Sequence, residues 1–181
     1  MQNWAFLGLA LLVAGCLPQY TVVQDSNPAA VAIAGQSIFV SWLPLDPNSF
    51  AKLRYSSAGE YAKVIANSNR ELQKGLRARY PKKRFVFAKT PTDLPSPGVD
   101  MSVFFREPQV KNQGLHGYGK LTITTTVTFF DAKSRREIRS VRISATTSGM
   151  NGWVQYNLEG SLDQCAYNVG TFVGETFADI R

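Results

Sequence analysis

The alternation of apolar and polar residues is clearest over residues 120–130, where it predicts a β-strand with two different faces. One face is expected to carry Leu121, Ile123, Thr125, Val127 and Phe129, and the other Thr122, Thr124, Thr126, Thr128 and Phe130. Turn formers at 131–134 and a second alternating segment at 137–147 predict that the chain returns as a β-hairpin. The inward residues of the returning strand are expected to be Val141, Ile143 and Ala145.

Three shorter segments predict further strands. Residues 37–43 are apolar on both faces, which indicates a central strand, and residues 85–87 form a short apolar strand. Residues 99–105 predict another strand, and Pro108 beyond it favours an edge position or a β-bulge, because proline cannot donate to a sheet ladder. The proline-rich residues 90–98 predict a loop.

Helical spacing marks the segment that ends before Pro81. Ser56 or Ser57 is its expected N-cap, and Glu60 completes a capping box with Ser57. The inward side of this helix is expected to carry Tyr61, Val64, Ile65, Ser68, Leu72, Leu76 and Tyr80.

A second helix is predicted at the end of the chain, beginning at a capping box over residues 161–164. Its buried face is expected to carry Leu162, Cys165, Ala166, Val169, Phe172, Val173, Phe177 and Ile180. Gly170 and Gly174 lower the helix propensity, and we expect them to let this helix approach a sheet closely.

The order of these elements predicts the fold class. A helix joins the first two strands, which predicts a right-handed crossover between parallel strands, and the remaining strands predict an antiparallel meander. The expected fold is α+β, with a four- or five-stranded mixed, mostly antiparallel sheet and two helices packed on one face. Residues 37–181 are long enough to bury one core and are expected to form a single domain.

The apolar residues 4–13 run into Val13-Ala14-Gly15-Cys16. About ten apolar residues are too few to span a bilayer, but they suit the apolar region of a secretory signal. The four residues resemble the lipobox of bacterial lipoproteins. The resemblance implies a signal peptide over 1–15 and a lipid-modified Cys16. Because the next residue is Leu17 rather than Asp, it also implies sorting to the outer membrane, with the domain facing the periplasm. The alternative is an ordinary buried segment.

Residues 17–36 contain turn formers and small residues and predict a tether, parts of which can lie on the domain. The chain has two cysteines. If Cys16 carries lipid, Cys165 has no disulfide partner, and its place on an apolar stripe predicts a buried packing residue.

The net charge of +7 is concentrated between residues 51 and 84, a segment that contains ten basic and two acidic residues. The densest part consists of Arg77, Arg79, Lys82, Lys83 and Arg84. This part is expected to be either a solvated helix face and turn or a surface for phospholipid head groups, lipid A phosphates or an acidic protein. A second basic group that is expected to extend this surface consists of Arg135, Arg136, Arg139 and Arg142. Nucleic acid is not an expected partner, because an exported protein rarely meets it.

Later segments resemble a group of small bacterial outer-membrane lipoproteins. The resemblance rests on Tyr118-Gly119-Lys120-Leu121-Thr122-Ile123, Asp131-Ala132-Lys133, Gly149, Gly152 and Gly160-Ser161-Leu162. The group includes the lipopolysaccharide-translocon lipoprotein, the activators of penicillin-binding proteins and uncharacterised lipoprotein families. It implies a long strand, a turn, a returning strand, a glycine-rich loop and a terminal helix, and it does not fix a function.

The residues needed for catalysis do not form a recognisable set. His116 is the one histidine and is expected to be an exposed loop residue, and the chain lacks a Gly-x-Ser-x-Gly motif. One histidine and one free cysteine leave no ligand cluster, so neither a metal nor a cofactor is expected. The carboxylates available to a cell-wall glycosidase are Asp93, Asp100, Glu107, Asp131 and Glu137, and nothing in their spacing pairs them.

The expected function is a membrane-anchored, non-enzymatic binding or assembly accessory of the bacterial cell envelope, with an envelope protein or an anionic lipid as its partner. The first alternative is binding of lipopolysaccharide or anionic lipid through the basic helix and turn. The second alternative is an enzyme that acts on the cell wall.

Overall fold

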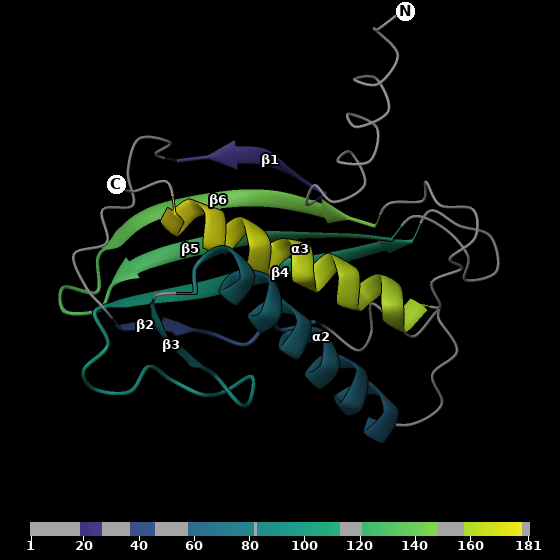
Figure 1. Ribbon diagram of the computed structural model, residues 1–181, viewed down its shortest axis with the longest axis horizontal. Helices are drawn as coiled ribbons and strands as arrows, with labels where there is room; N and C mark the ends of the chain where they lie inside the picture. Colours follow the sequence, from purple (N-terminus) through teal and green to yellow (C-terminus); the bar gives the residue numbers. More distant parts are fainter. Residues whose placement is uncertain are drawn as a thin grey trace, which may run out of the picture.

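Six strands form one mixed sheet in the order β1-β6-β5-β4-β2-β3, and two helices pack on one of its faces (Figure 1). The strands are β1 (Tyr20–Asp25), β2 (Ser37–Val40), β3 (Arg84–Phe87), β4 (Met101–Asn112), β5 (Leu121–Asp131) and β6 (Glu137–Thr146), and the helices are α2 (Ala58–Arg79) and α3 (Leu158–Ala178). This computed structural model describes residues 19–26, 37–45, 58–81, 83–112, 121–147 and 158–178. The α+β prediction is confirmed, with one strand more than expected.

The additional strand lies within the predicted tether. β1 pairs antiparallel with β6, from Tyr20 opposite Ala145 to Asp25 opposite Val141. Asp25 also accepts a hydrogen bond at 3.0 Å from the guanidinium of Arg139 on β6. Residues 20–25 are therefore part of the sheet rather than a linker between Cys16 and the domain.

The parallel pair that the crossover helix predicts is present, because β2 and β3 run parallel. However, β2 also pairs in parallel with β4, which places β2 between β3 and β4. β3 is thus an edge strand, and the antiparallel meander begins at β4 rather than at β3. The predicted hairpin of β5 and β6 is present, and in its register Thr126 lies opposite Arg142.

A β-bulge interrupts β4 where Pro108 predicted one. The register with β5 shifts between Arg106 and Gln109, and Glu107 has a left-handed backbone with φ of 48°. The pairing with β2 covers only the first residues of β4, ending at Val103. Pro108 therefore lies where β4 has a partner on one side alone, so its missing N–H breaks no ladder to β2.

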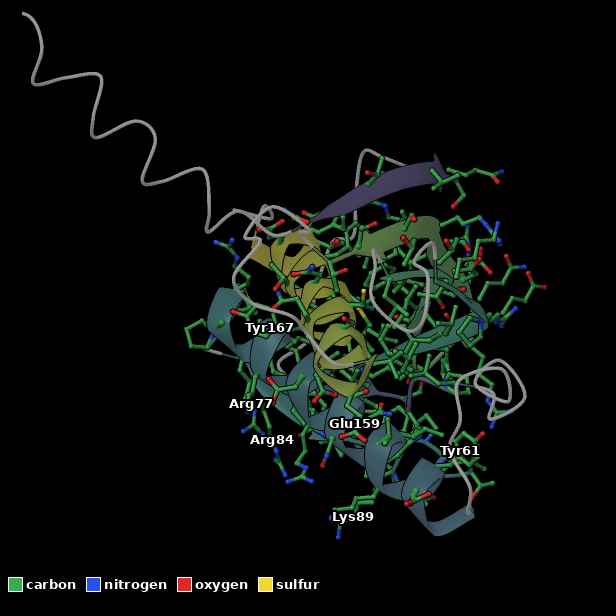
Figure 2. All side chains as sticks on the ribbon, turned by 90° about the vertical axis from the view of Figure 1, so that its right-hand side faces the viewer. Tyr61, Arg77, Arg84, Lys89, Glu159 and Tyr167 are labelled. Atoms are coloured by element: carbon green, nitrogen blue, oxygen red, sulfur yellow. The ribbon has the colours of Figure 1, made fainter. Side chains whose placement is uncertain are left out.

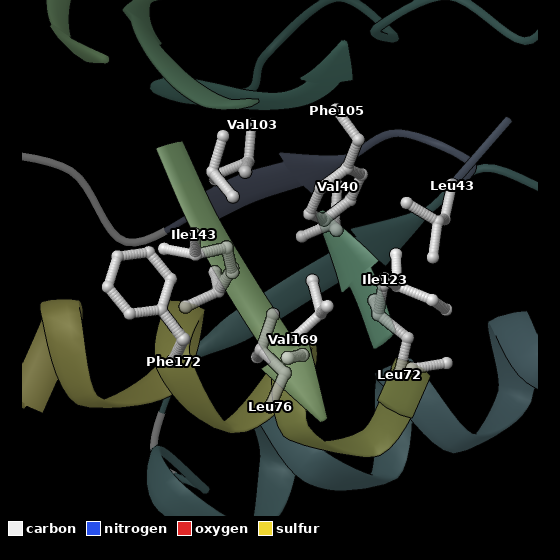
Figure 3. Packing of buried hydrophobic residues seen from close by; sticks show 14 of the residues in the cluster. Val40, Leu43, Leu72, Leu76, Val103, Phe105, Ile123, Ile143, Val169 and Phe172 are labelled. Atoms are coloured by element: carbon white, nitrogen blue, oxygen red, sulfur yellow. The ribbon is translucent and has the colours of Figure 1, made fainter. Parts of the chain in front are cut away.

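The core lies between the sheet and the helices (Figure 3). The predicted inward residues of the hairpin are buried. So are those of both helices, except that Tyr61, Ile65 and Tyr80 are half-buried and Ile180 lies outside the described residues. The largest fully buried side chains are Phe129, Phe177, Ile38, Leu43, Leu72, Leu76, Leu121, Ile123, Ile143 and Leu162. Phe129 meets Phe177 edge to face, with ring centroids 5.7 Å apart, which joins β5 to the end of α3.

The two helices run parallel and touch through backbone, which corrects the role predicted for the glycines of α3. A Cβ built on Gly170 would lie 2.0 Å from the carbonyl oxygen of Leu72, and one on Gly75 of α2 would lie 2.1 Å from that of Tyr167. Gly174 similarly faces Leu76 at 2.8 Å. The glycines serve the approach of α3 to α2, not to the sheet, because α2 lies directly over them.

The predicted start of the last helix is also wrong by about one turn. α3 begins at Leu158, so Ser161 lies inside the helix and is buried rather than capping it. Sequence spacing favoured the Ser161–Gln164 box because it fits the capping pattern, but helical residues precede it.

The helix-free face of the sheet is hydroxyl-rich along β5 and β6. Paired hydroxyls there are Thr122 with Thr146 at 3.3 Å, Thr124 with Ser144 at 3.3 Å, and Thr128 with Ser140 at 3.4 Å. Towards β4 and β2 the same face becomes aromatic, with Phe104 between Phe130 at 5.8 Å and Phe39 at 6.0 Å. One face of the sheet is thus sealed by helices, and the other carries polar rows and a small aromatic cluster.

Candidate functional site

The residues predicted to carry function lie in different parts of the molecule. Cys16, Lys82 and His116 lie outside the described residues. The other basic residues predicted as a surface lie at the end of α2 and the start of β3. No helix in the described part of the chain is long and apolar enough to cross a membrane.

Arg77 and Arg84 are exposed and project on the same side of the molecule (Figure 2). The guanidinium of Arg77 lies over the ring of Phe87, 5.0 Å from its centroid, which gives the charge a fixed position at the edge strand β3. The described residues provide neither arginine with an acidic partner. These two side chains form what we call the basic edge.

Arg79 and Lys83 differ from the basic edge. The Nε of Arg79 lies 3.1 Å from Oε1 of Glu175 on α3, so this arginine joins the two helices. Lys83 is half-buried in the turn before β3. The residues of the predicted basic stretch therefore have two different roles. The charges of Arg77 and Arg84 are exposed to solvent, whereas that of Arg79 is paired with the carboxylate of Glu175.

The arginines of the hairpin do not simply extend the basic edge. Arg139 forms an ion pair with Asp25 in which the two side chains are 14% and 15% exposed. Arg142 lies 3.7 Å from the largely exposed Glu107. Arg135 and Arg136 are exposed at the turn between β5 and β6.

A cavity of about 630 Å³ lies on the helix-free face, between the loop that precedes β4 and the β5–β6 turn. Its apolar wall includes Phe104, Phe130 and Leu94, and its charged residues are Arg106, Arg135 and Asp131. The guanidinium of Arg106 lies 5.4 Å from the centroid of the Phe130 ring. We call this space the loop cavity.

Residues with a left-handed backbone conformation lie at or next to the loop cavity. Among the described residues, three have a positive φ: Gly98 at 89°, Arg135 at 56° and Glu107 at 48°. Gly98 and Arg135 line the cavity, and Glu107 follows Arg106, which lines it. Left-handed backbone is unfavourable for residues with a Cβ, and such residues often cluster at functional sites.

Two features of the sequence lie at the loop cavity although neither predicted it. Pro108 predicted the bulge beside Arg106, and the prolines of residues 90–98 predicted the loop that covers Phe104. Arg135 was grouped with Arg139 by spacing alone. Only the fold shows that Arg135 and Arg106 line the same space.

Two of the five candidate glycosidase carboxylates, Asp93 and Asp131, stabilise turns in the described structure. Asp93 accepts hydrogen bonds from the Thr90 hydroxyl at 2.6 Å and from the Lys89 amide at 2.6 Å, and these bonds lower the pKa of its carboxyl. Asp131 accepts from the Ser134 amide at 2.7 Å and the Ser134 hydroxyl at 2.8 Å, which also lowers its pKa. Both groups stay ionised, so neither suits a general acid at neutral pH.

Asp163 has the opposite environment, in a hollow of about 280 Å³ between α2 and the first turns of α3. Burial raises the pKa of its carboxyl, the Ser68 hydroxyl at 2.9 Å opposes that shift, and Glu71 and Glu159 add to it. The described residues hold no group of three or more histidine, cysteine or acidic side chains that could bind a metal ion.

Cys165 is fully buried, which confirms the packing role that its position predicted. Its thiol points to the carbonyl oxygen of Leu121 at 3.4 Å, and burial raises its pKa to about 12. A thiol in this state is a poor nucleophile, because the thiolate is the reactive form.

Comparison with known proteins gives structural likenesses only. Neither a protein family nor a curated protein matches the chain. A PelC dodecamer from Paraburkholderia phytofirmans, in space group P6, aligns with a TM-score of 0.48 and 13% identity over 86% of this chain and 94% of that chain. A second PelC dodecamer from the same organism, in space group C2, gives a TM-score of 0.42 and 13% identity over 84% and 95%. Likenesses of this degree carry no argument about function or assembly.

Proposed function

We propose that this protein is a lipid-anchored, non-enzymatic binding or assembly accessory of the bacterial outer membrane. The observation that carries the proposal is the apolar run at residues 4–13 that ends in Val13-Ala14-Gly15-Cys16. Acyl chains on Cys16 would each contribute about 0.8 kcal/mol per buried CH₂, and two or three chains together make a stable anchor.

The pairing of β1 supports an anchor that holds the domain close to the membrane. Tyr20 begins β1 and is already part of the sheet. Four residues span at most about 14 Å at roughly 3.5 Å per residue, whatever conformation they adopt. The lipid would therefore enter the membrane close to the corner of the sheet formed by Tyr20 and Ala145.

The basic edge lies at the diagonally opposite corner. β1 and β3 are the two outer strands of the sheet. Across the paired strands, Tyr20 is level with Ile123 of β5, whereas Phe85 of β3 is level with Asp131 of the same strand. These two positions on β5 are eight residues apart. Spacings of about 4.8 Å between strands and 3.3 Å along them separate these corners by roughly 35 Å. An accessory held at one corner would thus present Arg77 and Arg84 to a partner away from the anchor.

The decisive experiment compares the two cysteines. Cys16→Ser should abolish incorporation of radiolabelled palmitate and prevent removal of the 15-residue signal, whereas Cys165→Ala should leave both unchanged. Palmitate labelling of Cys16→Ser at the level of the unaltered chain would overturn the proposal. Membrane fractionation of both variants then tests whether the acyl chains provide the attachment.

A second candidate function is binding of anionic lipid through the basic edge. It is favoured by the exposure of Arg77 and Arg84 and by the absence of acidic partners for them among the described residues. Cys16→Ser protein should bind vesicles that contain anionic lipid, and adding Arg77→Gln and Arg84→Gln should weaken this binding by more than tenfold, at about 1 kcal/mol per charge. The matched control is Lys63→Gln with Arg70→Gln, which removes two exposed charges from the same helix. Equal losses in both pairs, or binding insensitive to salt, would contradict this function.

A further inference from the structure

The loop cavity combines an apolar floor with cationic walls. Phe104 and Phe130 provide the floor, and the loop over residues 94–99 forms one side. Leu94 at its rim is 79% exposed, more than the other large apolar side chains in the part of the chain that the structure describes. An exposed leucine beside an aromatic hollow indicates a surface that an apolar group can cover.

The charged residues that line the loop cavity give it a net positive charge. Arg106 and Arg135 both line it, and neither has an acidic partner among the residues that the structure describes. Asp131 also lines it, but its Oδ1 accepts hydrogen bonds from the Lys133 and Ser134 amides of its own turn. Two guanidinium groups that lack an acidic partner among the described residues favour an anionic oxygen group such as a phosphate or carboxylate.

The size of the loop cavity restricts the ligand further. Its volume of about 630 Å³ falls within the range of about 300–1,000 Å³ that is usual for small-molecule sites. Since a water molecule occupies about 30 Å³ of the liquid, the space accepts a ligand of about twenty non-hydrogen atoms. A single hydrocarbon chain with one acidic head group has this size.

We propose that the loop cavity binds a single-chain anionic amphiphile, with its acidic head group at Arg106 and Arg135 and its hydrocarbon chain on Phe104, Phe130 and Leu94. The proposal does not depend on the lipid anchor or on the basic edge. Left-handed backbone also lies at both arginines, at Arg135 itself and at Glu107 in the bulge next to Arg106, and such conformations often occur at functional sites.

The test measures binding of radiolabelled dodecyl phosphate by equilibrium dialysis. The full chain is used as it is isolated, together with nanodiscs of zwitterionic lipid, and the signal of nanodiscs without protein is subtracted. Dodecanoate tests whether a carboxylate head group serves as well as a phosphate. Dodecyl maltoside is the uncharged control, and inorganic phosphate is the control without a chain.

The variants separate the cavity from general surface charge. Arg106→Gln and Arg135→Asn should each weaken binding about tenfold, the usual loss of one charge-assisted hydrogen bond. Asparagine is chosen at 135 because it tolerates the left-handed backbone. Lys111→Gln on the same strand and Arg136→Gln in the same turn are the matched controls and should leave binding unchanged. Leu94→Asp should weaken the binding of both acidic probes without unfolding the domain, since Leu94 is exposed.

Binding of dodecyl phosphate or dodecanoate that both arginine variants reduce supports the proposal, and comparing the two identifies the head group. Dodecyl maltoside binding as tightly as the acidic probes, or equal losses in the control variants, would overturn it. So would inorganic phosphate binding as tightly as dodecyl phosphate, because the hydrocarbon chain would then contribute nothing.

Discussion

The two faces of the sheet follow the same alternation of residues but are covered in different ways. On one face, α3 lies over β5 and β6, and α2 packs against α3 with backbone touching backbone at Gly75 and Gly170. On the other face, hydroxyl rows and a few rings are covered only in part, by the loop before β4. The first face is closely packed and tolerates few substitutions, whereas the second holds the loop cavity with Arg106 and Arg135.

Because of this difference, substitutions on the two faces of the sheet should affect different properties of the protein. The helix-covered face buries most of the apolar surface, so its substitutions should act on the free energy of unfolding. The helix-free face contributes fewer fully buried side chains, so its substitutions should act mainly on ligand affinity. Neighbouring residues on one strand point to opposite faces, which allows matched comparisons.

The largest effect is expected at Phe129 and its neighbour. Phe129 is fully buried, and Phe129→Ala should lower the free energy of unfolding by about 3–5 kcal/mol. Phe130 is half-buried on the other face, and Phe130→Ala should cost less than half as much. Chemical denaturation of both variants measures the difference, and equal losses would mean that the two faces contribute equally to stability.

The next effect concerns the contact of the two helices. Gly170→Ala places a Cβ where a carbonyl oxygen lies 2.0 Å away, so the helices must separate, at a cost of about 3 kcal/mol. Gly59→Ala in α2 meets nothing within 4 Å and should stabilise the protein by up to about 1 kcal/mol through helix propensity. Thermal unfolding of the two variants would contradict the packing argument if both shifted in the same direction.

A smaller effect is expected from the arginines of β6, which lie on opposite faces. Arg139→Gln removes the largely buried ion pair with Asp25 and should cost about 1–3 kcal/mol. Arg142→Gln removes only an exposed pair with Glu107 and should change stability by less than about 0.5 kcal/mol. Hydrogen exchange should also show faster exchange of β1 amides in Arg139→Gln alone.

The smallest effect is expected at Asp163. The pKa of its carboxyl is higher in the folded protein than its usual value of 3.8, chiefly because of burial, so ionisation favours the unfolded chain. This destabilisation is present above the folded-state pKa and vanishes as the pH falls below about 4. Asp163→Asn keeps an acceptor for Ser68 and should raise the melting temperature slightly at pH 7 but not at pH 3. An equal rise at both pH values would contradict the role of charge.

The sequence predicted the elements that depend on local periodicity. The hairpin, the buried stripes of both helices and the bulge near Pro108 follow from residues close together in the chain, and all were confirmed. Cys165 was also identified as a packing residue from its place on one stripe. These features can be predicted without knowing which element of the fold each one packs against.

The sequence could not predict which elements pack against one another in the fold. Gly170 and Gly174 indicated a close approach, but only the parallel packing of α2 and α3 shows what they approach. β1 was missed because Tyr20–Asp25 is a short edge strand whose residues are mostly exposed. The loop cavity was missed because Arg106 and Arg135, which both line it, are far apart in sequence and come from different strands and turns.

The parallel arrangement of α2 and α3 has a consequence for the peptide dipoles. Dipoles of parallel helices add, so the partial negative charges of both C-terminal ends, about half an elementary charge each, lie side by side. α2 has Arg77 and Arg79 in its last turn, whereas α3 has no basic residue there. Arg79, beside Glu175, therefore compensates the ends of two helices at once. Part of the basic charge of this segment thus has a structural role that follows from the direction in which the two helices run, whether or not any partner binds there.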